Sequence, residues 1–262
     1  MTRLSTGAFA LLVAATIAAF FVTQHLKVTT PLIAGYPAPV PSVINPLHPV
    51  QCGKWNSGST TISFYLLHRS DTVVVSVVNQ DGDIVDTVAD GRHMRRGVRN
   101  PDGVFHWDGR ESNGLLAPDG SYYFRVALVH QGRTVPQVSS VPVKVKTVAP
   151  RPVITSVTPA MIPSPTGSSR VTIRYRGNEG RGGTILLYRT EPSGRPQLVK
   201  TFLTPWKGQT AIWDGTVRNQ QPAPAGTYLV ALQVSDAACN TGQFPTRIPP
   251  APGTANTTVT VG

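Results

Sequence analysis

The sequence predicts an all-β chain that folds as two consecutive β-sandwich domains, preceded by an N-terminal helix and a proline-rich segment. Gly and Pro number 24 each among 262 residues, so turn-forming residues interrupt the chain throughout. After the N-terminus, apolar residues come in short runs that alternate with polar ones, as in half-buried strands. One motif also occurs twice, 106 positions apart, which indicates a repeated unit.

Residues 1–28 are expected to form a transmembrane signal-anchor. The uncharged run from Leu4 to Thr23 is long enough to cross a hydrocarbon core of about 30 Å as a helix. No small-residue cleavage site follows this run, so we expect an uncleaved single-pass anchor with the N-terminus cytoplasmic and the β domains outside. The alternative is a cleaved signal peptide and a secreted protein.

Residues 29–50 are expected to form a stalk. They contain Pro31, Pro37, Pro39, Pro41, Pro46 and Pro49. Proline at this density favours extended polyproline II and excludes a helix or a central strand. An ordinary linker without this stiffness is the alternative.

The repeated motif is Trp-Asp-Gly, a variable loop, Pro-x-Gly-x-Tyr and an alternating strand. Its residues are Trp107, Asp108, Gly109, Pro118, Gly120 and Tyr122 in the first copy, and Trp213, Asp214, Gly215, Pro224, Gly226 and Tyr228 in the second. The Trp and the Tyr, 15 positions apart in both copies, are expected to pack in a core. Asp-Gly and Pro-x-Gly are expected to form turns.

Further strands are expected around each copy of the motif. In the first domain, residues 51–148, they are Thr61–Leu67, Val73–Val78, Ile84–Val88, Val104–Trp107, Tyr122–Val129 and Val141–Val145. In the second, residues 149–262, they are Val153–Val157, Arg170–Tyr175, Thr184–Arg189, Leu198–Phe202, Thr210–Trp213, Tyr228–Ser235 and Thr257–Val261. About seven short strands in about 100 residues are typical of a two-sheet sandwich.

Both copies resemble the Ig-like domain of flagellar hook-capping proteins (the FlgD-like type), which recurs in bacterial surface proteins. The run Ser235–Asn240 is similar to an Asp-x-x-Gly-Asn turn of that domain, with Cys239 in place of Gly. The resemblance extends over about residues 55–262. It implies tandem Ig-like sandwiches and a surface location, but it implies no ligand.

The sequence contains no recognisable catalytic, cofactor or metal motif. The six histidines lack metal-ligand spacing, and no nucleophile-elbow or phosphate-loop motif is present. Asp81-Gly82-Asp83 lacks the rest of a calcium loop, so we expect a hairpin there. Asp108 and Asp214 occupy equivalent places in separate domains, so they are turn formers and not a catalytic carboxylate pair. We expect a non-enzymatic protein without a cofactor or a small-molecule substrate.

The formal net charge is +11, which suggests an anionic partner. The extracytoplasmic location argues against nucleic acid. The hypothesis is a surface for an anionic cell-wall polymer or lipid headgroups; another surface protein is a further possible partner. Its candidate residues are Arg92, Arg95, Arg96 and Arg99 in a basic loop, and Arg174, Arg176, Arg181 and Arg189 in the second domain. The alternative is an ordinary solvated charged face on an Arg-rich chain.

Cys52 and Cys239 are the only two cysteines. In an oxidising compartment they are candidates for a disulfide that joins the two predicted domains. Free thiols or an intermolecular bond are the alternatives.

These inferences favour a membrane-anchored extracytoplasmic protein that displays Ig-like domains for binding, spacing or assembly at the cell surface. One alternative is the accessory region of a larger enzyme whose catalytic domain is absent from this sequence. A flagellar hook-assembly scaffold is another, and it would need a rod-binding segment in place of the span.

Overall fold

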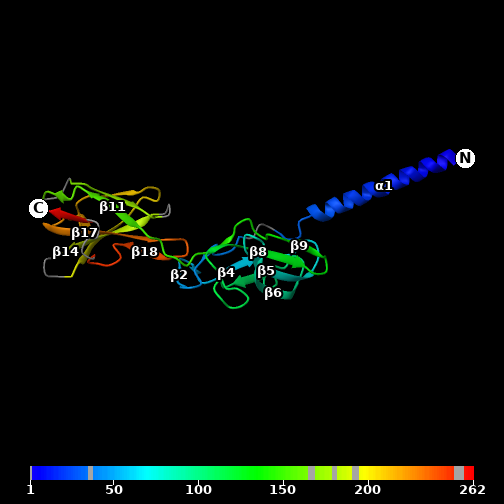
Figure 1. The fold of residues 1–262 in the computed structure, drawn as a ribbon, viewed down its shortest axis with the longest axis horizontal. Coiled ribbons are helices and arrows are strands. Elements are labelled where there is room, and N and C mark those ends of the chain that lie inside the picture. The colour runs from blue at the N-terminus through cyan, green and yellow to red at the C-terminus, as the bar shows by residue number, and fades with distance from the viewer. Residues whose placement is uncertain (1, 35–37, 165–168, 179–181, 191–194, 251–256) are drawn as a thin grey trace. The chain divides into compact units, whose positions relative to one another are not determined.

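Strands make up most of the regular structure in this computed structural model, which describes residues 2–34, 38–164, 169–178, 182–190, 195–250 and 257–262 (Figure 1). The elements are α1 (Thr2–Thr29), β1 (Val43–Ile44), β2 (Gln51–Cys52), β3 (Trp55–Asn56), β4 (Thr60–Ser63), β5 (Asp71–Val78), β6 (Ile84–Met94), β7 (Val104–Trp107), β8 (Gly120–Leu128), β9 (Arg133–Val135), β10 (Val143–Val145), β11 (Val153–Thr158), β12 (Met161–Ile162), β13 (Val171–Arg176), β14 (Gly183–Thr190), β15 (Gln197–Leu203), β16 (Thr210–Trp213), the 3-10 turn η1 (Arg218–Gln220), β17 (Gly226–Ser235), β18 (Thr241–Phe244) and β19 (Thr258–Val261). The predicted all-β fold is confirmed.

Helix α1 covers the apolar run in which the sequence predicts a membrane span. Phe9, Ile17 and Phe21 on this helix are exposed. Among the described residues, however, no helix combines the length and the apolar character needed to span a membrane. The predicted transmembrane helix is therefore not supported.

The chain folds into two compact units. Unit 1 consists of Met1–Pro39, Thr61–Trp107 and Tyr122–Pro142. Unit 2 consists of Val40–Thr60, Asp108–Ser121 and Val143–Gly262. Each unit contains segments that are distant in sequence, so non-local pairing builds both.

In unit 1, β5 is the central strand of an antiparallel sheet and pairs with both β6 and β8. Strand β9 adds to β8. The pairing of β5 with β6 is interrupted by three register shifts along its length. Alternate side chains of β8 are buried from Tyr122 to Leu128, as the period-two pattern predicts. The buried rings of Phe64 and Phe105 stack with centroids 5.1 Å apart.

Unit 2 contains a two-layer sandwich. One sheet has the order β11-β13-β16, and the other has the order β12-β19-β17-β14-β15, with β18 also paired to β17. Residues of both sheets share one core, which includes Ile173, Trp213, Leu187, Tyr228 and Val259. The two sheets of unit 2 thus pack around a shared core as two layers.

The two copies of the repeated motif have matching geometry. Trp107 and Tyr122 are buried with ring centroids 5.0 Å apart, and Trp213 and Tyr228 are buried with centroids 5.4 Å apart. The amides of the Ala that precedes each motif Pro donate to the carbonyls of Gly109 and Gly215 at 3.0 and 2.9 Å. Both glycines have positive φ, at 74° and 71°, which explains the Asp-Gly turn.

The proline-rich segment is not a free stalk, which corrects the prediction for residues 29–50. In unit 1, Leu32, Ile33 and Ala34 are buried, and Ile33 forms a bridge with Leu66. In unit 2, β1 pairs in parallel with β10, and Ile44 is fully buried. The apolar residues between the prolines are stabilised by burial against the strands. In an extended stalk the same residues would remain exposed to water.

Candidate functional site: a disulfide-bonded turn and two groups of arginines

The turn between β17 and β18 in unit 2 is organised by Asp236. Its Oδ1 accepts hydrogen bonds from the amides of Ala238 and Asn240, both at 2.9 Å. The amide of Cys239 donates to the Asp236 carbonyl at 3.1 Å. The turn closes because one short acidic side chain satisfies several backbone donors.

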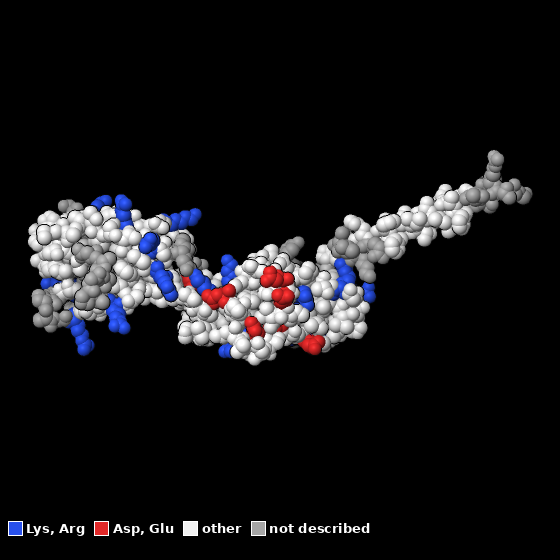
Figure 2. All heavy atoms as spheres, viewed as in Figure 1, with Lys and Arg blue, Asp and Glu red and all other residues white. Residues whose placement is uncertain are grey.

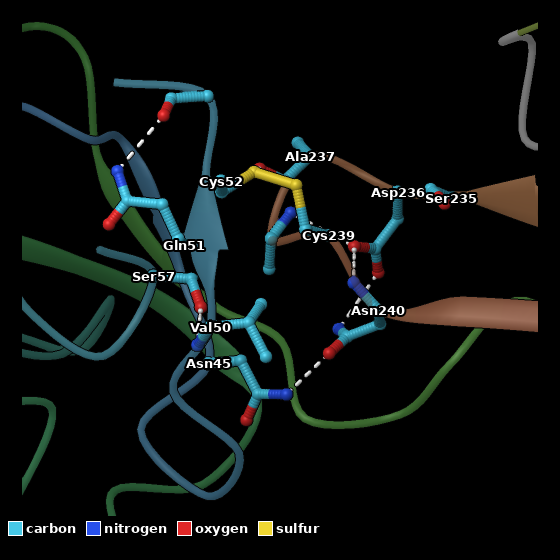
Figure 3. The surroundings of a disulfide bond; sticks show 12 residues. Asn45, Val50, Gln51, Cys52, Ser57, Ser235, Asp236, Ala237, Cys239 and Asn240 are labelled. Carbon is cyan, nitrogen blue, oxygen red and sulfur yellow. Dashed lines mark hydrogen bonds between the residues drawn. A yellow bond between two sulfur atoms is a disulfide. The ribbon is translucent and has the colours of Figure 1, made fainter. Parts of the chain in front are cut away.

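Cys239 occupies the position at which the Asp-x-x-Gly-Asn turn described above has Gly, and the φ angle of Cys239 is +61°. A residue with a Cβ is strained in this left-handed region. Its sulfur forms a disulfide with Cys52, with the Cα atoms 5.7 Å apart (Figure 3). Both cysteines belong to unit 2. The bond joins β2, near the start of this unit's chain, to the β17–β18 turn.

A buried polar network accompanies the disulfide. Asn45, 1 % exposed, donates from Nδ2 to Oδ1 of Asn240 (Figure 3). The Nδ2 of Asn240 donates to the Lys146 carbonyl at 2.8 Å and to Asp236 Oδ2 at 3.0 Å. The ammonium of Lys146 lies 3.4 Å from the same carboxylate oxygen. Segments distant in sequence are thus held by one bond and one satisfied network, which favours a single conformation of this part of unit 2.

Replacing Cys239 separates the strain from the crosslink. Cys239→Gly and Cys239→Ala both lose the disulfide, but only Gly adopts a φ of +61° without a steric penalty. We expect Cys239→Gly to be the more stable of the two by about 1 kcal/mol. Urea unfolding followed by tryptophan fluorescence measures the difference. Equal midpoints would show that the turn relaxes when the bond is absent.

The predicted basic loop is partly a strand, because β6 continues to Met94 and includes Arg92. Arg92 donates to the carbonyls of Val104 and Pro101 at 2.8 and 2.9 Å and lies over the Phe105 ring. The guanidinium of Arg99 lies 5.6 Å from the Tyr65 ring centroid. Arg92 and Arg99 are thus engaged in contacts with neighbouring residues of unit 1. The side chain of Arg96 is exposed and makes no hydrogen bond or ion pair with the described residues.

Arg95 forms an ion pair with Asp102. Its Nε and Nη2 donate to the two carboxylate oxygens at 2.8 and 3.2 Å, and its amide donates at 3.1 Å. These hydrogen bonds lower the pKa of Asp102 to about 2. The loop is therefore closed on itself by a bidentate pair, and Arg95 is not a free cation.

Arg95→Gln is expected to raise the pKa of Asp102 from about 2 toward the ordinary value of 3.8. The pKa of Asp102 is lower in the folded protein than in the unfolded chain, so the ion pair stabilises the fold at pH values above the unfolded-state pKa. This stabilisation is lost as the pH falls toward 2. Carboxyl-carbon NMR during an acid titration measures both proteins. An unchanged Asp102 midpoint would contradict the pair.

The second group of arginines lies in unit 2. Arg174 and Arg176 are exposed on one face of β13, opposite the buried Ile173 and Tyr175, as the alternation predicts. Arg189 donates from Nη2 to the Ala225 carbonyl at 3.1 Å. Arg181 lies outside the described residues.

The two groups of arginines belong to different units. In the view of Figure 2, Lys and Arg side chains are scattered among the other residues of each unit. Of the described arginines in the two groups, Arg96, Arg174 and Arg176 have exposed side chains that make no hydrogen bond or ion pair with described residues. The anionic-polymer hypothesis therefore rests on Arg96 in unit 1 and on Arg174 and Arg176 in unit 2.

Comparison with known proteins identifies the domain type in the first half. The model of the FlgD Ig-like domain matches residues 53–132, a stretch that contains Trp107 and Tyr122. The resemblance that the motif indicates is therefore confirmed for this part, which is less than half of the chain. No curated protein matches the sequence.

Solved structures resemble the chain only loosely. A marsupial T cell receptor matches with a TM-score of 0.40 and 9 % identity, over 88 % of this chain and 72 % of the receptor chain. Dimeric latent PorU from Porphyromonas gingivalis matches with a TM-score of 0.28 and 12 % identity, over 90 % of this chain and 21 % of PorU. Native alpha-2-macroglobulin from E. coli matches with a TM-score of 0.27 and 11 % identity, over 80 % of this chain and 13 % of its own. This chain thus spans only a small part of the latter two proteins.

Proposed function

We propose that this chain is a non-catalytic extracytoplasmic protein that displays Ig-like domains for binding, spacing or assembly at the cell surface. The observation that carries the proposal is the Cys52–Cys239 disulfide. Such bonds persist in oxidising compartments and are rare in the reducing cytosol. The FlgD Ig-like match supports a module whose function depends on display and not on chemistry.

The N-terminus is the proposed means of export. The uncharged run Leu4–Thr23 supports this role, because an apolar run behind Arg3 is what secretory signals and signal-anchors share. We further propose that this run keeps the protein at the membrane after export. Release after cleavage is the alternative outcome.

Thiol status and protease access in cells test the location together. Cells expressing the chain are lysed under an alkylating agent that adds mass to free thiols, with and without reductant. We expect no shift before reduction and a shift of two adducts after it, and we expect cleavage of the β region by protease added outside the cytoplasmic membrane. Cys52→Ser, which leaves one thiol, is the control. Free thiols together with protease protection would overturn the proposal. Fractionation of the same samples distinguishes the anchored from the released form.

A further inference from the structure

A pocket of about 480 Å³ in unit 1 is lined by basic side chains. Its lining includes His68 and Arg69 from the bend before β5, His130 from the β8–β9 connection, Arg133 at the start of β9, and Thr30 after α1. The described residues that line it include no Asp or Glu. Two chain segments, residues 68–69 and 130–133, thus bring two guanidinium groups and two imidazoles to one concave site.

The basic side chains are held in place by neighbouring groups. Arg133 donates from Nη2 to the Thr30 carbonyl at 3.1 Å. The Nε2 of His68 lies 2.9 Å from the Pro31 carbonyl, which can only accept, so this nitrogen is the donor. The side chain of Arg69 is exposed and makes no hydrogen bond or ion pair with described residues. Its fork is therefore available to a ligand.

His130 is oriented by the buried carboxylate of Asp71, whose Oδ1 lies 2.9 Å from His130 Nδ1. Asp71 also accepts from the amides of Thr72, His130 and Gln131. Burial raises the pKa of Asp71, but these hydrogen bonds outweigh it and lower the pKa below its ordinary value. An ionised Asp71 makes Nδ1 the donor, so His130 presents its other nitrogen away from the carboxylate.

We propose that this pocket binds an oxyanion of the phosphate or sulfate class. A guanidinium group can donate two parallel N–H hydrogen bonds to two oxygens of such an anion. Arg69 and Arg133 each supply one guanidinium group to the pocket. The only carboxylate in contact with these side chains in the described structure, Asp71, is already satisfied by four donors and points to His130. The volume exceeds that of the free ion, so a phosphate that carries a substituent also fits.

The inference is independent of the proposed function, because it uses only contacts within unit 1. It also differs from the arginine hypothesis drawn from the sequence, since none of those arginines lines the pocket. A phosphorylated soluble ligand and a phospholipid headgroup share the chemistry that the pocket recognises. The experiment must therefore separate these two sources.

Sulfate and inorganic phosphate are titrated into the full chain at low ionic strength, with binding measured by NMR shifts and calorimetry. We expect saturable binding that Arg69→Gln weakens at least tenfold, because a charged hydrogen-bonding partner is lost. Arg174→Gln removes the same charge from an exposed strand face and is the matched control, with less than a twofold change expected. Arg133→Gln is the second pocket variant. Absence of saturable binding, or equal weakening by Arg69→Gln and Arg174→Gln, would overturn the proposal.

Vesicles distinguish the two sources of the anion. Phosphatidylcholine vesicles with and without phosphatidylglycerol are compared for wild type and Arg69→Gln. A headgroup site predicts that the gain from phosphatidylglycerol depends on Arg69 and is reduced by free phosphate. A site for a soluble ligand predicts saturation by phosphate and a vesicle response that is the same in both proteins.

Discussion

Cys52→Ala is expected to lower the free energy of unfolding by about 2–5 kcal/mol, the range for loss of a native disulfide. The bond has a sequence separation of 187 residues, so its removal releases a long loop in the unfolded chain. It also removes the covalent support of the strained Cys239 turn. Urea unfolding of the oxidised protein and of Cys52→Ala, followed by tryptophan fluorescence, measures the loss.

Reductant is the control for this experiment. Dithiothreitol should destabilise the wild type toward the level of Cys52→Ala and leave the variant unchanged. If the oxidised wild type and Cys52→Ala unfold at the same urea concentration, the disulfide contributes nothing to stability in solution.

Trp213→Ala is expected to cost about 3–5 kcal/mol, as for truncation of a large buried aromatic. Trp213 is fully buried beside Tyr228. Its indole Nε1 donates to the Thr216 carbonyl at 2.7 Å, so the variant also leaves that carbonyl without this donor. Thermal and urea unfolding, with the native signal followed by circular dichroism, measure the change.

Trp206 provides the matched control for Trp213. It lies in the same unit, but 67 % of it is exposed. Trp206→Ala should change stability by no more than about 0.5 kcal/mol. Similar losses in the two variants would contradict the assignment of Trp213 to the core.

Period-two alternation next to a buried aromatic was sufficient to predict the strands around the repeat. Val104–Trp107 and Thr210–Trp213 have the predicted bounds. The motif identifies these strands because its turns fix where each strand ends. Strand β17 begins two residues before the predicted start, at Gly226.

The proline-rich segment could not be read correctly from local pattern alone. Proline density describes the backbone preference of a segment but not what its apolar residues contact. Ile33 and Ile44 are buried by partners from other parts of the chain. Two-residue strands such as β1 are too short to produce a periodic signal.

The candidate sites depended even more on tertiary structure. Sequence proximity grouped Arg92, Arg95 and Arg99, but the structure uses each of them in a local contact. His68 and His130 lack metal-ligand spacing in sequence, and only the fold brings both into one pocket. Spacing along the sequence does not show which basic side chains are engaged in local contacts or which of them lie close together in the fold.

The outer edge of β6 bears on how the protein associates with itself at high local concentration. Strand β6 is the terminal strand of its sheet, its pairing with β5 has three register shifts, and it carries Asp86, Asp90 and Arg92. A straight, uncharged edge would invite the same strand of a neighbouring molecule to pair with it. The irregular, charged edge disfavours such polymerisation, so many copies can be packed together without growing into fibrils from this side.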